Sequence, residues 1–361
     1  ADVFSTLSDG IRGKRAQKWR LVDEAVPLSQ FETRIQERAE AAAGSASGDQ
    51  PGVTLNELTF AQDDTGYRFE YVRLTLEADR RLATLTMHAP KASAETIAAL
   101  DADAIRAQGD EFWALKAYRE LNEALLHLRF NHIEVGTVLL KTEGNADAAL
   151  AMDAKLAELQ KDDWFVRETV LYMGFVLRRL DLTARSFYAL IEEDSCFAGN
   201  LFELALAADR SYLLEDEDGE NGVAIGALSN GDLLMSNGLS RIGCRFLHDP
   251  EAGQALAAGQ GRYYGIEAED AGLVTFALDD IDYPDEVRPA IEERASLSPD
   301  ALTGMEANLR FAGAETVETK VFGRLSAGQN WIFQRPNAVG ETGALQSFGE
   351  PTTPQFDWRR T

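Results

Sequence analysis

Two stretches of this chain, separated by about 250 residues, carry the same pattern. Residues 13–26 align without gaps on residues 265–278, with glycine, alanine, leucine, valine and alanine recurring in the same order. Further on, the sequence IQERA at residues 35–39 matches IEERA at residues 291–295. Two matches in the same order, at nearly the same offset, indicate two copies of one unit. Each copy is predicted to form a short helix, a strand and a longer helix, with the pairs Leu21-Val22 and Leu273-Val274 as the buried strand.

The position of the first copy predicts the domain organisation. The second copy comes about 200 residues into a unit that starts near Tyr67, whereas only 12 residues precede Gly13. The first copy is therefore predicted to be the end of a first unit whose earlier part is missing from this sequence. The stretch from Gly44 to Gly52 is rich in turn-forming residues and is the natural linker. The predicted divisions are residues 1–43 (end of a first unit), 44–66 (linker), 67–298 (second unit) and 299–361 (helical extension and tail).

Between the copies, strand-like and helix-like patterns alternate. Residues 68–76 and 82–87 alternate apolar and polar side chains around a short turn, which predicts a β-hairpin. Residues 111–130 carry apolar side chains at helical spacing, and residues 135–140 form a short β-branched run. Further predicted elements are helices at 146–160, 164–180, 201–208, 301–311 and 315–333, a strand at 186–191 and a turn at 194–200. This alternation predicts an α/β core with a helical C-terminal extension.

Composition excludes several classes of partner. The formal net charge of -25 disfavours nucleic acid, whose phosphates reward clustered lysine and arginine. No apolar run is long enough to span a bilayer, and no segment has the pattern of a signal peptide. The two cysteines, Cys196 and Cys244, lack the spacing of a zinc site or a disulfide framework. We therefore expect a soluble cytoplasmic protein with no metal site and with neither nucleic acid nor membrane as partner.

Three motifs resemble the crotonase (enoyl-CoA hydratase/isomerase) superfamily, whose members act on coenzyme A thioesters. Residues 195–210 (SCFAGNLFELALAADR) resemble its glycine-containing turn and the buried helix that follows. Residues 82–90 (LATLTMHAP) resemble the first hairpin, and residues 268–274 (AEDAGLV) resemble the closing element of the family. The resemblance covers residues 67–295 in the order of the family, and it implies a ClpP/crotonase-like α/β fold.

Four further motifs are more specific, because ordinary enoyl-CoA hydratases lack the extension that contains two of them. These motifs are KTEG at residues 141–144, WFVRET at 164–169, SPDALTGMEANLRF at 298–311 and QNWIFQRPNAVG at 329–340. They are similar to the second half of the benzoyl-CoA-dihydrodiol lyases, a ring-cleaving family with two crotonase-like units. The resemblance implies hydrolytic opening of 2,3-dihydro-2,3-dihydroxybenzoyl-CoA to an aliphatic semialdehyde CoA ester and formate, in aerobic benzoate breakdown. It also implies an acyl-CoA substrate, no metal or redox cofactor, and a homodimer.

The resemblance assigns an oxyanion-binding role to the turn at Gly199 and Asn200. Crotonases stabilise a thioester enolate or oxyanion with two backbone N–H groups, one of them at a helix N-terminus, where donors are free. Alignment with the small-Gly-x-Asp segment of the family assigns the second donor to the amide of Leu150. Cys196 lies in the same turn, so two interpretations stay open, a substrate contact or a buried structural thiol.

Glu203 is the candidate catalytic residue. It lies in the first turn of an otherwise apolar helix and is predicted to be buried, so its carboxylate must be paired, hydrogen-bonded or protonated. In hydratases a glutamate at this position performs acid–base chemistry, for which burial raises the pKa usefully. The alternative is a structural glutamate held by an arginine or by the amides of the turn.

Three departures from the pattern of the family weaken the catalytic interpretation. The turn reads Gly199-Asn200-Leu201 where the family has three glycines, and Ala151 replaces the glycine of the first oxyanion segment. Residues 227–232 show no counterpart of the second catalytic glutamate. Three hypotheses therefore remain: a lyase whose catalytic unit lies outside this chain, a hydratase or isomerase that uses Glu203, or a non-catalytic structural and dimerisation unit.

Overall fold

The computed structural model describes residues 2–45, 52–216, 219–310, 312–313 and 315–359. The chain divides into two compact units, Ala1–Val53 and Thr54–Thr361. Each unit is described by itself.

The described residues of the first unit form three helices. They are α1 (Asp2–Ser5), α2 (Gly13–Lys18) and α3 (Leu28–Ser45), and no residue of α3 is buried. Leu21 and Val22 lie in a bend and are 47% and 45% exposed, so the prediction of a buried strand here is wrong. A strand needs a neighbour for its backbone hydrogen bonds, and the described residues of this unit contain no sheet.

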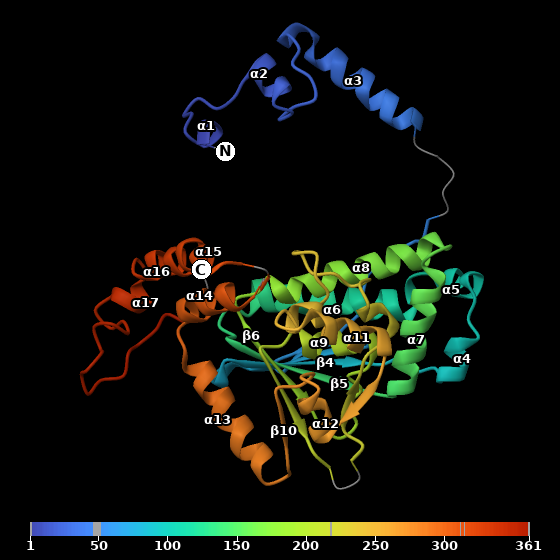
Figure 1. The fold of residues 1–361 in the computed structure, drawn as a ribbon, viewed down its shortest axis with the longest axis vertical. Helices are drawn as coiled ribbons and strands as arrows, with labels where there is room; N and C mark the ends of the chain where they lie inside the picture. Colours follow the sequence, from blue (N-terminus) through green and yellow to red (C-terminus); the bar gives the residue numbers. More distant parts are fainter. Residues whose placement is uncertain (1, 46–51, 217–218, 311, 314, 360–361) are drawn as a thin grey trace. The chain divides into compact units, whose positions relative to one another are not determined.

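An eight-stranded sheet forms the core of the second unit, in the order β1-β2-β3-β4-β5-β6-β7-β10 (Figure 1). Pairing is antiparallel from β1 to β4 and parallel from β4 to β10. The strands β8 (Gly222–Ala224) and β9 (Arg262–Tyr264) pair separately. The strands of the main sheet are β1 (Ala61–Asp63), β2 (Gly66–Arg68), β3 (Val72–Glu77), β4 (Leu82–His88), β5 (Thr137–Glu143), β6 (Ser186–Ile191), β7 (Arg210–Leu214) and β10 (Phe276–Leu278).

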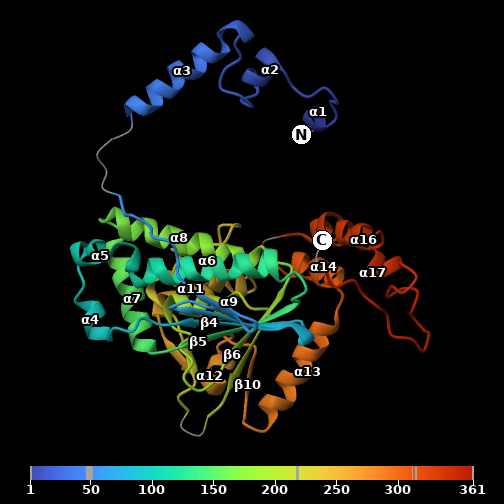
Figure 2. The same ribbon diagram turned by 180° about the vertical axis from the view of Figure 1, so that it is seen from behind.

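Helices cover the sheet. The long helices α6 (Trp113–Asn131) and α8 (Trp164–Asp181) run side by side in both views (Figures 1 and 2). Helix α13 (Asp282–Ser296) packs on β6 and β7, where its Tyr283, Val287 and Ile291 join one apolar cluster with strand residues. The remaining helices are α4 (Ala94–Ala98), α5 (Ala102–Gln108), α7 (Ala146–Leu159), α9 (Phe202–Leu206), α10 (Arg241–Arg245), α11 (Pro250–Gly259), α12 (Gly265–Asp270), α14 (Pro299–Leu309), α15 (Val317–Thr319), α16 (Ser326–Ile332) and α17 (Pro336–Val339).

The predicted α/β class is confirmed, with a helical C-terminal part. The hairpin exists as β3 and β4, and the predicted strand at residues 186–191 coincides with β6. Leu273 and Val274 are buried as predicted, but they lie in the bend before β10 and not in the strand itself. Within the described residues, no helix is long and apolar enough to cross a membrane.

The boundary between the two compact units, at Val53 and Thr54, falls within the predicted linker. The predicted linker at residues 44–66 lies partly outside the described residues, and α3 extends to Ser45. Residues 54–66 pack with the second unit, because β1 joins its sheet and the backbone N–H of Asn56 donates to Asp110 at 2.6 Å.

Candidate functional site

The candidate site lies where β6 ends and the chain turns into α9. A short 3-10 turn at Gly199–Leu201 leads directly into the helix. Gly199 has a φ of +56°, a conformation that glycine adopts without strain. The backbone N–H of Cys196 donates to the Thr142 hydroxyl at 3.0 Å, and the N–H of Ala224 donates to the Phe197 carbonyl at 2.9 Å. These contacts fix the turn against β5 and β8.

A carboxylate from α7 fills the space beside this turn. Asp153 is completely buried, and its two oxygens accept from the side-chain amide of Asn200 at 3.2 Å and from the backbone N–H of Leu228 at 2.8 Å. Two glycines make room for it. A Cβ atom on Gly226 would lie 2.1 Å from Asp153 Oδ2, and one on Gly199 would lie 2.9 Å from Asp153 Cβ.

The electrostatics of Asp153 follow from this position. Burial raises the pKa of its carboxyl to about 7, against the hydrogen bonds from Leu228 and from both the side chain and the backbone of Asn200, which lower the pKa. The side-chain amide of Asn200 is thus directed at a carboxylate of the protein itself, beside the turn whose backbone N–H groups are predicted to receive a substrate oxyanion. The hydroxyl of Tyr118 completes the arrangement by donating to Asn200 Oδ1 at 3.0 Å.

Leu150 does not supply a free donor. Helix α7 begins at Ala146 after its N-cap Asn145, which makes Leu150 the fifth residue of the helix. Only the first four N–H groups of a helix lack an intrahelical acceptor, so the amide of Leu150 belongs to the helical ladder. The position of Leu150 inside α7 disfavours the predicted role of its amide as an oxyanion donor.

Glu203 is buried and paired, as the structural alternative predicts. It is 1% exposed, and its carboxylate accepts from the Ser229 hydroxyl at 2.7 Å and from Arg241 at 3.3 Å. Arg241 is 2% exposed and also pairs with Asp181 at 2.9 Å. Burial raises the pKa of Glu203, whereas Arg241 lowers it. A carboxylate closed in this way has no path to a substrate.

Cys196 is among the residues that line a cavity of about 350 Å³, although it is almost fully buried. The cavity is lined by backbone and side chains of the turn and of β8 and β9, including Ala198, Val223 and Arg262. The side chain of Cys196 is 1% exposed, and burial raises the pKa of its thiol to about 11. The thiol therefore stays protonated near neutral pH and is a poor nucleophile.

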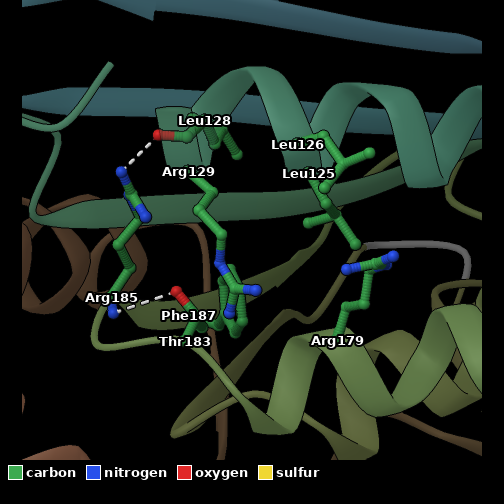
Figure 3. A pocket seen from close by; sticks show the side chains of 8 residues that line it. All are labelled: Leu125, Leu126, Leu128, Arg129, Arg179, Thr183, Arg185 and Phe187. Atoms are coloured by element: carbon green, nitrogen blue, oxygen red, sulfur yellow. Dashed lines mark hydrogen bonds between the residues drawn. The ribbon is translucent and has the colours of Figure 1, made fainter. Parts of the chain in front are cut away.

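A second, much smaller hollow of about 20 Å³ lies where α6 and α8 end (Figure 3). Three arginines line it, and two of them donate to carbonyl groups. Arg129 donates to the Leu182 carbonyl at 2.6 Å, and Arg185 donates to the His132 carbonyl at 2.8 Å. Cationic side chains are favourable at helix C-termini, and the volume holds about one water molecule. This hollow is part of the helix capping and not a substrate site.

Several solved structures share the fold of this chain. The structure resembles that of an enoyl-CoA hydratase/isomerase from Marinobacter aquaeolei (TM-score 0.56, 16% identity, 81% of this chain and 100% of that one). It also resembles an enoyl-CoA hydratase from Polaromonas sp. JS666 (TM-score 0.52, 18% identity, 79% of this chain and 99% of that one). The chain has the crotonase fold. No family model matches it.

The sequence is far closer to one curated protein than to these crotonase structures. It is 51% identical over 365 residues to the benzoyl-CoA-dihydrodiol lyase of Aromatoleum evansii, with all of this chain aligned. The resemblance predicted from the motifs is therefore confirmed. The chain spans 64% of the length of that relative.

The sequence analysis did not identify three residues that surround this crotonase-like turn and Glu203. These are Asp153, Gly226 and Arg241, which come from α7, the segment after β8 and α10. One signal was available for Arg241, because a buried glutamate requires a cation or donors. No comparable signal identified Gly226, which matters only because it meets Asp153 in three dimensions.

Proposed function

We propose that this chain is part of an enzyme that opens the ring of 2,3-dihydro-2,3-dihydroxybenzoyl-CoA, as in benzoyl-CoA-dihydrodiol lyase. The supporting observation is the 51% identity to that lyase, which extends over the whole chain. In the proposed reaction one water is added to the dihydrodiol, and the products are an aliphatic semialdehyde CoA ester and formate. The proposal includes a role in benzoate degradation.

Within this enzyme, we propose that the described crotonase-like unit supports the fold and does not carry the chemistry. Stabilising a thioester oxyanion requires backbone donors aimed at an open position. Here Asp153 lies against the turn and accepts from the side-chain amide of Asn200, and Glu203 is held by Arg241 and Ser229. The acid–base and oxyanion groups of the ring opening would then come from elsewhere in the enzyme.

The remaining parts of the proposal rest on the resemblance to crotonases. The substrate carries its own coenzyme A, and the ring opening is a hydrolysis with no net redox change. We therefore propose an acyl-CoA substrate, no metal or redox cofactor, a cytoplasmic location and a homodimer.

A chimera tests the enzymatic assignment. The region of the Aromatoleum evansii lyase that matches this chain is replaced by these 361 residues. The chimera is supplied with the dihydrodiol thioester, and formate is quantified. We expect release within about tenfold of the parent lyase. A folded chimera that binds the thioester but releases no formate would contradict the assignment.

The isolated chain tests the supporting role and the hydratase alternative. We expect formate release near background, because losing an acid–base group costs about 10² to 10⁴ in rate and losing an oxyanion donor about 10² to 10³. Formate release that disappears in Glu203→Gln would place the active site in this unit. Saturable hydration of crotonyl-CoA that depends on Glu203 would favour the hydratase alternative.

A further inference from the structure

A cavity of about 280 Å³ lies where the end of α9 meets α10 and the end of α14. Among the described residues, its lining has no member in common with the lining of the cavity beside Cys196. Sites for small molecules typically combine apolar walls with a few charged groups. This cavity has both, and its apolar lining residues are Leu206, Ala207, Ala208, Met235, Leu309 and Ala312.

Most charged side chains that line this cavity are compensated within the protein. Arg241 pairs with Asp181 at 2.9 Å. Arg310 pairs with Asp209 at 3.6 Å and with Glu306, which lies behind it, at 3.0 Å. Buried charges are stable only when they are paired in this way. These four lining groups therefore need no ligand.

Arg245 is the exception among the lining residues. Its Nε donates to the Gly272 carbonyl, but it forms no ion pair with any described residue. Burial lowers the pKa of Arg245, and no carboxylate acts in the opposite direction. An arginine nevertheless stays charged in a protein, so a cation is held away from water without a counter-ion. An anion in the cavity would stabilise this residue.

We propose that the cavity binds a small monocarboxylate, whose carboxylate pairs with Arg245 and whose apolar body lies against the end of α9. Because Nε serves Gly272, the two Nη groups are the donors for the ligand. Asp181 and Asp209 line the same cavity and would repel a second negative charge, which selects against dianions. The proposal does not depend on the ring-opening function.

The volume limits the size of the ligand. Sites for drug-sized molecules have about 300 to 1,000 Å³, so a cavity of about 280 Å³ suits a smaller compound. The lining also includes Leu309 and Arg310 at the end of α14, in the C-terminal helical part. A ligand paired with Arg245 would therefore contact both the core and this C-terminal part.

Titration calorimetry of the full chain with three probes tests the charge requirement, at constant ionic strength set with sodium chloride. Benzoate is a monocarboxylate with an apolar ring, and we expect a Kd on the order of 1 mM. Benzamide has nearly the same shape but no charge, and should bind about tenfold more weakly or less. Phthalate carries a second carboxylate and should also bind about tenfold more weakly or less. Equal affinities for benzoate and either of the other probes would overturn the proposal.

Substitutions test the role of Arg245. Arg245→Met should weaken benzoate binding about tenfold or more and leave benzamide binding unchanged. Arg245→Lys keeps a positive charge and should bind benzoate more tightly than Arg245→Met. The matched control is Arg288→Met, at a 66% exposed side chain of α13 outside the cavity, which should bind benzoate like the parent. Melting temperatures check that each variant is folded. A folded Arg245→Met chain with the benzoate affinity of the parent would contradict the assignment.

Protection of Cys244 locates the ligand without any substitution, so it is informative even if an Arg245 variant does not fold. Cys244 lines the same cavity and is only partly buried. At ten times the Kd of benzoate the cavity is about 90% occupied, so the reaction of Cys244 with a soluble disulfide reagent should slow about tenfold. Benzamide at the same concentration should slow it less than about twofold. If saturating benzoate left the rate unchanged, the ligand would bind elsewhere and the proposed site would be wrong.

Discussion

The carboxylate of Asp153 accepts a hydrogen bond from the side-chain amide of Asn200 at 3.2 Å, inside the turn where a crotonase would bind an oxyanion. The carboxylate and the turn come from different layers of the fold, since Asp153 lies on α7 and Asn200 follows β6. Their contact gives the side-chain amide of Asn200 an acceptor within the protein. The carboxylate also lies against Gly199 of the turn, where a Cβ atom would come within 2.9 Å of Asp153 Cβ.

The two glycines beside Asp153 should tolerate no side chain. In Gly226→Ala the new Cβ would lie 2.1 Å from Asp153 Oδ2 and 2.5 Å from Gly199 Cα, so one of them must move. We expect the free energy of unfolding to fall by about 2 kcal/mol or more, as for other overpacked cores. Gly304→Ala is the control, because nothing lies within 4 Å of the new Cβ inside α14. It should leave stability unchanged or raise it by about 1 kcal/mol, and urea unfolding measures both.

The group formed by Arg241, Glu203 and Asp181 should behave as one buried ion cluster. Among the described residues, Arg241 is the only cation that forms an ion pair with Glu203. Arg241→Met therefore leaves the carboxylates of Glu203 and Asp181 buried without this cation. Breaking such a pair typically costs about 3 to 5 kcal/mol. Adding Glu203→Gln should recover part of the loss, because fewer unpaired charges then remain buried. Strict additivity in the double-mutant cycle would contradict this coupling.

The two thiols should differ in reactivity. Cys196 is 1% exposed with its pKa raised to about 11, whereas Cys244 is only partly buried. In native protein at pH 8, a soluble disulfide reagent should modify Cys244 and leave Cys196 unmodified. Peptide mapping after alkylation identifies the site, and Cys244→Ser should remove the reaction. Rapid modification of Cys196 would show that the turn opens to solvent.

The sequence predicted the parallel core and its helices because their periodicity is local. The run at residues 186–191 is uniformly buried in β6, which explains its continuous apolar character. The sequence analysis did not predict β7. It misplaced β10, since a three-residue strand such as Phe276–Leu278 is defined by the strand it pairs with and not by its own pattern.

The sequence predicted where the candidate site lies, but not which groups of the protein bind the side chains in it. The motif located Gly199, Asn200 and Glu203 in one buried turn, as the structure has them. Leu150 was assigned by alignment with the small-Gly-x-Asp segment of the family, whereas Asn145 caps a helix that already includes Leu150. A cap forms from local hydrogen bonds, so family alignment gave no warning of it.

The pH dependence of stability offers the most direct test of the Asp153 position. Burial raises the pKa of this carboxyl from 3.8 to about 7 in the folded chain. Between pH 3.8 and about 7, the Asp153 carboxyl is protonated in the folded chain and ionised in the unfolded chain. This contribution to stability is therefore present below about pH 4 and is lost as the pH rises towards 7.

The comparison is between the parent chain and Asp153→Ala, because other buried carboxyls, Glu203 and Glu120 among them, also have raised pKa values. We expect the variant to be less stable at pH 5, and the difference from the parent to shrink by an amount on the order of a few kcal/mol by pH 8, at about 1.4 kcal/mol per pKa unit. Asp162 is exposed, so the free energy of unfolding of Asp162→Ala should differ from that of the parent by the same amount at every pH. Urea unfolding at pH 5, 6, 7 and 8 measures the three curves. If the difference between the parent and Asp153→Ala grew with pH, the carboxylate would be stabilised as an anion by Asn200 and Leu228, and their hydrogen bonds would outweigh burial.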